Sequence, residues 1–382
     1  MRILIALTYY RPHYSGLTIY VERLARALAK RGHHVTVLTS RYHPTLASHE
    51  MIDGVEIFRL QVALRLSKGV IMPSMPAWAW RLAKEADVIN LHTPQLDAAP
   101  IAIMGKILGK PVVMTYHCDL RLPQGLVHQV ANQASHIANH ISALAADVIV
   151  TNTQDYAENS PFLKRYLQKV QIISPPVELP VVTERDIFEF RQKTGILPGQ
   201  RIIGMASRLA TEKGVEYLLA AMPEILIYHP EARVIFVGQY LDVMGEEAYA
   251  TKLAPTIQHL KEHWTFLGTL PPQEFAAFLA TAEVTVLPSI NSTESYGMVQ
   301  IESMMSNTPV VATDIPGVRQ PVLTSGMGEI IPPADTKALS RAITSILKQP
   351  EKYKKNILAL LEQHSPAFVA GQYEALFKQT SR

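Results

Sequence analysis

The sequence has a single cysteine, Cys118, among its 382 residues, so no disulfide can form within the chain. Nothing therefore points to an oxidising compartment. No run of about 18 apolar residues is present, which argues against a transmembrane helix. The apolar stretch that follows Met1 is too short for a signal peptide. We therefore expect a cytoplasmic protein.

The sequence also lacks tandem repeats, low-complexity tracts and any recognised nucleic-acid-binding motif. These absences disfavour a repeat protein, a disordered chain and a nucleic-acid partner. The composition is that of a folded globular protein, with 48% hydrophobic and 18% charged residues. A single core rarely extends beyond ~250–300 residues, so we expect two domains.

The net charge of +3 conceals a difference between the two halves of the chain. Residues 1–178 carry 18 Lys and Arg against 12 Asp and Glu, a balance of +6, and residues 179–382 carry 18 against 21, a balance of −3. A basic half suits an anionic partner, such as a phosphate or a membrane surface. Chance variation between solvated faces is an equally good interpretation.

Strand-like apolar runs alternate with helix-like segments, which predicts βαβ units and parallel sheets. The expected strands are residues 3–7, 35–38, 88–91, 112–115, 148–150, 202–205, 234–237, 265–267, 284–287 and 310–312. The proline-rich segment Ser174–Pro180 interrupts the alternation and is typical of a linker. We expect an α/β protein with two Rossmann-like doubly wound lobes facing a cleft, residues 1–178 and 179–365. Residues 366–382 are predicted to be helical.

Two glutamates flank a predicted helix start after the strand at residues 284–287. Gly297 precedes an apolar helical run, so Glu294 lies just before the helix and Glu302 about one turn inside it. The first N–H groups of a helix have no intrahelical partner and the dipole there is positive, which suits a phosphate. The two carboxylates can accept hydrogen bonds from sugar and ribose hydroxyls. A glutamate that merely stabilises the helix dipole is the simpler alternative.

Two cations follow the strand expected at residues 202–205. Arg208 and Lys213 lie in a strand-to-helix loop, at the sheet edge where such folds bind ligands. Cations fixed at this edge would stabilise a departing diphosphate. They could also be ordinary surface residues, since most Lys and Arg side chains are solvated.

The N-terminal half offers two further candidates at strand ends. His117 follows the strand expected at residues 112–115 and is placed to reach across the cleft. Gly16 lies between the first strand and the first helix, where a missing side chain lets the backbone approach a phosphate or an acceptor. His117 could instead satisfy a buried backbone group, and Gly16 could be an ordinary turn residue.

Together, these segments resemble the retaining glycosyltransferase family 4, also called glycosyl transferases group 1. Glu294 and Glu302 match its paired-glutamate motif, and Ser207–Gly214 matches its Arg/Lys loop. Thr115–Asp119 is similar to its histidine segment, and Gly16 to its N-terminal glycine loop. The resemblance covers nearly the whole chain, with order and spacing kept. It implies a GT-B fold, in which a C-terminal helix packs back onto the first lobe.

The resemblance also implies a reaction, namely transfer of a hexosyl group with retention of configuration and with no metal or other cofactor. The chain has no Asp-x-Asp triplet of the kind that holds a divalent ion in other glycosyltransferases. Ser15-Gly16 departs from the two adjacent glycines that are usual in the family.

The family motifs assign roles to individual residues. Glu302 should bind the nucleotide ribose, and His117 should approach the sugar and acceptor. The implied catalytic residues are His117, Glu294, Arg208 and Lys213. The implied contacts to a nucleotide-diphosphate sugar donor are Gly16, Arg208, Lys213, Glu294, Tyr296, Gly297, Met298, Val299 and Glu302.

Residues 57–84 mix cations with tryptophans, which suits a membrane interface. The residues concerned are Arg59, Arg65, Lys68, Trp78, Trp80, Arg81 and Lys84. An ordinary amphipathic wall of the first lobe explains the pattern slightly better. The hypothesis that follows is a carbohydrate or lipid-linked acceptor, such as a glycolipid or cell-surface polysaccharide precursor, with peripheral contact at the inner membrane face.

Two other functions remain open. A sugar-nucleotide epimerase can share this fold, because fold alone does not fix function. A non-catalytic nucleotide-sugar-binding protein would keep the same polar residues. The glutamate pair together with the Arg/Lys loop favours transfer over both.

Overall fold

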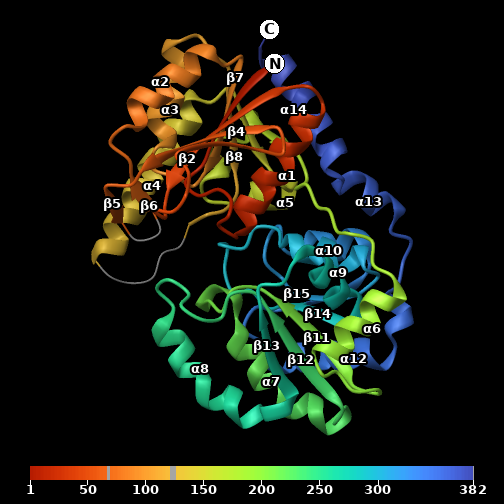
Figure 1. The fold of residues 1–382 in the computed structure, drawn as a ribbon. Coiled ribbons are helices and arrows are strands. Elements are labelled where there is room, and N and C mark those ends of the chain that lie inside the picture. Colours follow the sequence, from red (N-terminus) through yellow and green to blue (C-terminus); the bar gives the residue numbers. More distant parts are fainter. Residues whose placement is uncertain (67–68, 121–125, 382) are drawn as a thin grey trace. The chain divides into compact units, whose positions relative to one another are not determined.

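The computed structural model describes residues 1–66, 69–120 and 126–381 (Figure 1). The chain divides into two compact units. One consists of Met1–Val177 with Gln363–Arg382, and the other of Glu178–Glu362. Each is built on a sheet of mainly parallel strands with helices between them, which is the α/β class predicted from the alternation.

The first unit contains an eight-stranded sheet in the order β10-β9-β8-β7-β1-β2-β4-β3, in which only the β3–β4 pair is antiparallel. The strands are β1 (Arg2–Ala6), β2 (His34–Arg41), β3 (His49–Ile52), β4 (Val55–Gln61), β7 (Val88–Thr93), β8 (Val112–Tyr116), β9 (Val148–Thr151) and β10 (Val170–Ile172). β5 (Leu64–Leu66) and β6 (Gly69–Ile71) form a separate antiparallel pair.

Some helices of the first unit, such as α1 and α5, begin at a side-chain cap. The Ser15 side chain accepts a hydrogen bond from the Thr18 N–H at 3.2 Å, and the Thr153 side chain caps α5 in the same way. The helices are α1 (Gly16–Lys30), α2 (Met75–Glu85), α3 (Ala98–Ile107), α4 (Leu126–Ala145), α5 (Gln154–Asn159) and α14 (Pro366–Thr380), with 3₁₀ turns at Leu163–Arg165 and Leu167–Lys169. α13 (Leu358–His364) crosses from the second unit into the first.

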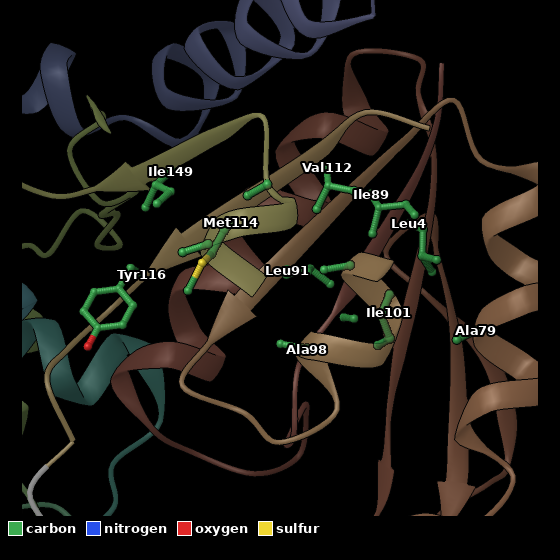
Figure 2. Packing of buried hydrophobic residues seen from close by; sticks show 14 of the residues in the cluster. Leu4, Ala79, Ile89, Leu91, Ala98, Ile101, Val112, Met114, Tyr116 and Ile149 are labelled. Atoms are coloured by element: carbon green, nitrogen blue, oxygen red, sulfur yellow. The ribbon is translucent and has the colours of Figure 1, made fainter. Parts of the chain in front are cut away.

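The core of the first unit lies between the central strands and the helices α2 and α3. Figure 2 shows Leu4, Ile89 and Met114 of the sheet facing Ile101 of α3. α3 approaches the sheet closely at Gly105, where a Cβ atom would lie 2.6 Å from Val112 Cγ2. Only glycine permits that approach without displacing the strand.

The C-terminal helix α14 packs against α1 within the first unit. Tyr373 is fully buried, and its hydroxyl lies 2.9 Å from that of Tyr20. At the rim, Glu374 pairs with Arg31 at 2.7 Å. Phe368, on the same helix, is 43% exposed. The last residue of the predicted helix, 382, lies outside the described residues.

The second unit contains a six-stranded, fully parallel sheet in the order β13-β12-β11-β14-β15-β16. Its strands are β11 (Arg201–Ala206), β12 (Ala232–Val237), β13 (Trp264–Gly268), β14 (Val284–Leu287), β15 (Val310–Thr313) and β16 (Gly328–Ile331). Its helices are α6 (Glu184–Lys193), α7 (Val215–Tyr228), α8 (Glu247–Leu260), α9 (Pro272–Thr281), α10 (Met298–Met305), α11 (Gln320–Ser325) and α12 (Thr336–Lys348), with 3₁₀ turns at Thr211–Lys213, Lys261–His263 and Pro350–Tyr353.

Residues 57–84 do not form one amphipathic element. They span part of β4, the β5–β6 pair and most of α2, because turn residues interrupt the apolar pattern. Lys68 lies outside the described residues. Trp78 packs against the core, whereas Trp80 is 37% exposed. Within the described ranges, no helix is both long and apolar enough to cross a membrane.

Candidate active site

The order in which strands are added to the sheet of the second unit reverses between β11 and β14. β12 and β13 extend the sheet on one side of β11, whereas β15 and β16 extend it on the other side of β14. Ligands of open α/β sheets bind beyond the carboxyl ends of the strands at such a reversal. Arg208 and Lys213 follow β11, and Glu294 follows β14, so the predicted donor residues of this unit flank the reversal.

Gly214 allows the two loops at the reversal to touch. It ends the 3₁₀ turn Thr211–Lys213 with φ +65°, and a Cβ atom there would lie 2.1 Å from the Pro288 carbonyl oxygen. The Ile290 N–H also donates to the Glu212 carbonyl oxygen at 3.1 Å. A side chain at Gly214 would therefore push the loop after β11 away from the loop after β14.

An ion pair joins these loops. Lys213 Nζ lies 2.6 Å from Glu294 Oε2, and the two side chains are 18% and 15% exposed. Arg208 forms a second pair with Glu212 at 3.1 Å and keeps 37% of its side chain exposed. Partly shielded charges interact more strongly than fully solvated ones, so this site presents two cations that are each held by a carboxylate.

The loop after β14 leads into α10 through a glycine in the left-handed conformation. Gly297 has φ +77°, and a Cβ atom there would lie 2.3 Å from Leu287 Cδ2. No side chain caps α10 at Gly297. The helix therefore starts with backbone N–H groups directed toward the carboxyl edge of the sheet, which is the geometry of an anion site.

Gln300 braces this helix start from within the core. Its Nε2 donates to the carbonyl oxygens of Tyr296 at 2.7 Å and of Val318 at 2.9 Å. Tyr296 is 6% exposed, and burial raises the pKa of its hydroxyl. Glu302, about one turn into α10, is 7% exposed. The structure thus brings Arg208, Lys213, Glu294 and the first turn of α10 to one edge of one sheet.

The first unit has its own reversal, between β1 and β7. Gly16 is the exposed first residue of α1, in the connection that follows β1, and His117 directly follows β8, the strand next to β7. His117 Nε2 lies 2.9 Å from Nδ1 of His92, the penultimate residue of β7. The Tyr20 ring of α1 meets the His117 ring edge-on, with centroids 4.9 Å apart.

Burial keeps this histidine pair uncharged. It lowers the pKa of His117 to about 3. For His92, burial and the neighbouring His117 hold the pKa well below its usual range. A neutral imidazole has one donor and one acceptor nitrogen, so the pair can exchange a hydrogen bond without charge.

Three polar residues at these sites were missed by sequence reasoning. His92 and Asn90 lie inside or just beyond a run that was interpreted only as an apolar strand. Asp97 is partly buried just before α3, and burial raises its pKa to about 6. The available signal was position for two of them, since His92 lies at the carboxyl end of β7 and Asp97 lies after it, whereas Asn90 lies in the middle of the strand.

Comparison with known proteins identifies the family to which the chain belongs. Residues 186–358 match the family model of glycosyl transferases group 1, and residues 15–175 match the model of the glycosyl transferase 4-like domain. The chain belongs to this glycosyltransferase family 4, as the motifs predicted, and it is a glycosyltransferase of the GT-B class.

Its relatives are similar over most of their length. An uncharacterized glycosyltransferase of Methanocaldococcus jannaschii, MJ1607, is 25% identical over 350 residues, 87% of this chain and 85% of that protein. The D-inositol 3-phosphate glycosyltransferase of Corynebacterium diphtheriae is 25% identical over 92% of this chain and 86% of that protein. The phosphatidyl-myo-inositol mannosyltransferase of Mycobacterium leprae is 22% identical over 95% and 92%.

Solved structures share the fold. Anabaena Alr3699/HepE in complex with UDP and glucose superposes with a TM-score of 0.78 at 19% identity, over 99% of both chains. Sucrose-phosphate synthase from Thermosynechococcus elongatus has a TM-score of 0.75 at 22% identity, over 99% of this chain and 98% of that chain.

Proposed function

We propose that the protein is a retaining hexosyltransferase that moves a sugar from a nucleotide-diphosphate sugar to a carbohydrate or lipid-linked acceptor. The observation that carries the proposal is the Lys213–Glu294 pair at the strand reversal, next to Arg208 and the start of α10. This arrangement combines charge neutralisation for a diphosphate with a carboxylate for sugar hydroxyls, and the reaction needs both.

The donor would be bound by two kinds of group. Arg208, Lys213 and the first N–H groups of α10 would hold the diphosphate and stabilise its charge as the glycosidic bond breaks. Glu302 would accept hydrogen bonds from the ribose, and Glu294 from the sugar. Residues 296–299 would hold the sugar and the distal phosphate through their backbone. The named binding partners of HepE, UDP and glucose, support a donor of this type.

Binding of the diphosphate would change the partner of Lys213. Its ammonium is neutralised by Glu294. A diphosphate carries more charge than one carboxylate, so it would share Lys213 and let Glu294 turn toward the sugar hydroxyls. We propose that Arg208 and Lys213 replace a metal as the counter-charge of the leaving group, as the family resemblance implies.

The acceptor is proposed from the surface of the first unit and from the relatives. Trp80 is 37% exposed, with the Lys84 ammonium 5.4 Å from its ring, and Arg81 lies 5.2 Å from the Trp78 ring. Cations beside tryptophans suit a headgroup layer. Since one relative is named for a phosphatidyl-linked acceptor, we propose a lipid-linked acceptor and a reversible contact at the inner membrane face.

The direct test is to identify a donor and then follow its product. A thermal-shift screen against nucleotide sugars should find a ligand that stabilises the folded protein by about 2.7 kcal/mol at a hundredfold excess over its Kd. NMR of the product should then show the anomeric configuration of the donor. An inverted product would contradict retention, and an epimerised donor in the absence of acceptor would indicate the epimerase. Tight donor binding without turnover on any acceptor would support a non-catalytic binding protein.

A further inference from the structure

A hydrogen-bond network of buried polar side chains leads to His117 within the first unit. Asn90, His92 and Thr115 are each at most 1% exposed, and each makes a hydrogen bond to another of these three residues. Thr115 Oγ1 in turn lies 3.1 Å from the Tyr373 hydroxyl of α14. A buried polar group without a hydrogen-bond partner lowers the stability of the fold, so each group in this network must donate or accept in a way that suits its neighbours.

The orientation of the Asn90 amide determines which of its atoms donates a hydrogen bond and which accepts one. Asn90 Nδ2 lies 3.2 Å from the Val113 carbonyl oxygen, which can only accept a hydrogen bond. The opposite amide orientation would place two oxygens against each other. The amide nitrogen therefore faces Val113 and Thr115, and Asn90 Oδ1 faces His92 Nε2 at 2.9 Å.

The tautomers of both histidines follow from that orientation. Because Asn90 Oδ1 is an acceptor, His92 Nε2 must carry a proton. A neutral His92 then has its lone pair on Nδ1, which lies 2.9 Å from His117 Nε2. His117 must therefore donate from Nε2. The two rings are tilted by only 25° with centroids 5.2 Å apart, as expected for an edge-to-edge hydrogen bond.

We infer that Asn90 and His92 are positioning residues that hold His117 as the neutral tautomer with its proton on Nε2. In this tautomer Nδ1 of His117 is an acceptor, so a hydroxyl of the sugar or the acceptor that meets this nitrogen must donate to it. The tautomer follows from the hydrogen-bond geometry together with the neutral state of the buried His92, whereas the hydroxyl that meets His117 rests on the proposed function.

Aromatic residues hold the rings in this arrangement. The Tyr20 ring meets both imidazoles edge-on, at 4.9 Å from His117 and 5.8 Å from His92. The Tyr20 hydroxyl is bound by that of Tyr373. The strongly lowered pKa values of both histidines agree with a pair that stays uncharged. The support for His117 therefore extends from β7 through β8 to the C-terminal helix.

The tautomer decides what His117 can recognise. With the proton on Nε2, the ring accepts at Nδ1 and discriminates in favour of a hydroxyl that donates. The other tautomer would present an N–H at the same place and would leave a lone pair facing that of His92. Histidines at active sites depend in this way on the group that binds the other ring nitrogen.

Histidine-labelled protein tests the inference without any assay of activity. The chain has 14 histidines, and the His117 signals are identified by their loss in His117→Gln. Protonated and unprotonated ring nitrogens resonate far apart in ¹⁵N spectra. In the unmodified protein we expect His117 to be protonated at Nε2 only, from pH 6 to pH 8. A proton on Nδ1, or a mixture of tautomers, would overturn the inference.

Two variants of His92 separate positioning from packing. His92→Asn keeps a side-chain oxygen near the place of Nδ1, whereas His92→Leu fills similar space without an acceptor. We expect His92→Leu to mix the tautomers of His117 and to lower kcat about tenfold, the scale of one hydrogen bond, with the donor KM unchanged. His92→Asn should restore the Nε2 tautomer and most of kcat. Equal losses in both variants, or unchanged tautomers in His92→Leu, would contradict a positioning role.

The two proposals fail in distinguishable ways. If no nucleotide sugar is turned over, the proposed function fails while the tautomer measurement still stands. If transfer is observed but His117 is protonated at Nδ1, only the positioning role fails.

Discussion

The Lys213 ammonium lies 2.6 Å from the Glu294 carboxylate, although 81 residues separate them in the sequence. Lys213 follows β11 and Glu294 follows β14. These two strands are neighbours only because the strand order of the sheet reverses between them. The pair therefore links the fold to the chemistry. It stabilises the contact between two loops, and it presets the cation and the carboxylate that the donor would use.

Removal of the Lys213 charge should impair turnover more than folding. We expect Lys213→Met to lower kcat/KM by about 10- to 150-fold, which corresponds to about 1.5–3 kcal/mol for a hydrogen bond to a charged group. Lys193→Met is the matched control, since Lys193 pairs with Glu274 at 2.7 Å in the same unit but is 64% exposed. Similar losses in both variants would indicate a general effect of charge rather than a donor contact.

The two glutamates of the motif should have separable effects. Glu302→Gln should weaken the binding of a nucleoside diphosphate measured by calorimetry, because a neutral amide offers the ribose one weaker acceptor oxygen in place of the two oxygens of a charged carboxylate. Glu294→Gln should mainly lower kcat, because its partner is the transferred sugar. Glu283→Gln, which precedes β14 at the opposite end of the strand, serves as the control. Unchanged affinity and rate in both site variants would rule out the assignment.

Chelation should leave transfer intact if Arg208 and Lys213 supply the counter-charge. We expect initial rates to be the same with and without EDTA. A loss of activity in EDTA that magnesium or manganese restores would instead place a metal in the reaction.

The buried histidines should make stability depend on pH. Their folded pKa values lie below the unfolded value of about 6.5, at about 3 for His117, so as the pH falls below about 6.5 the unfolded state binds more protons than the folded state. Their contribution is complete above pH 6.5 and is lost as the pH falls. Asp97, with its pKa raised to about 6, acts in the opposite direction below that pH. The urea midpoint should fall from pH 7 to pH 5, and less steeply in His92→Asn than in a control at exposed His43. Identical slopes would show that burial of His92 is not the cause.

Peripheral membrane contact should be electrostatic and reversible. Each Lys or Arg near anionic lipid contributes about 1 kcal/mol, and exposed charges are screened over about 8 Å at physiological salt. Co-sedimentation with anionic vesicles should therefore fall at high salt and in Trp80→Ala. Phe188→Ala, at an exposed aromatic of α6 in the second unit, should bind as the unmodified protein does. Equal, negligible binding to anionic and neutral vesicles would favour a soluble acceptor.

Periodicity predicted most of the architecture because buried parallel strands are continuous apolar runs. The segments that ended as β1, β7, β11 and β14 were all recognisable in this way. The strands β3, β4, β10 and β16 and the β5–β6 pair were missed, since partly exposed strands with mixed polarity lack that signal. Tertiary packing alone decides that Phe368 is exposed while Tyr373 is buried.

The candidate site was predictable where chemistry is concentrated in a short segment. Residues 208–213 and 294–302 each carry several polar groups at a strand end, so each could be recognised locally. The support of His117 could not, because Asn90, His92, Thr115 and Tyr373 come from three elements far apart in the sequence. Only the pairing of β7 with β8 and the packing of α14 bring them together.

The division of the first unit into two pieces has a consequence for biosynthesis. A ribosome makes residues 1–177 before the second unit and Gln363–Arg382 after it, so the first unit lacks α14 until the whole second unit has been made. Tyr20 then has no Tyr373 to bury it, and the surface of α1 that α14 covers stays exposed throughout synthesis of the whole second unit. Although domains usually fold in the order in which they emerge, the second unit can here finish before the first. A fragment that ends at Val177 would retain that exposed helix permanently and should aggregate.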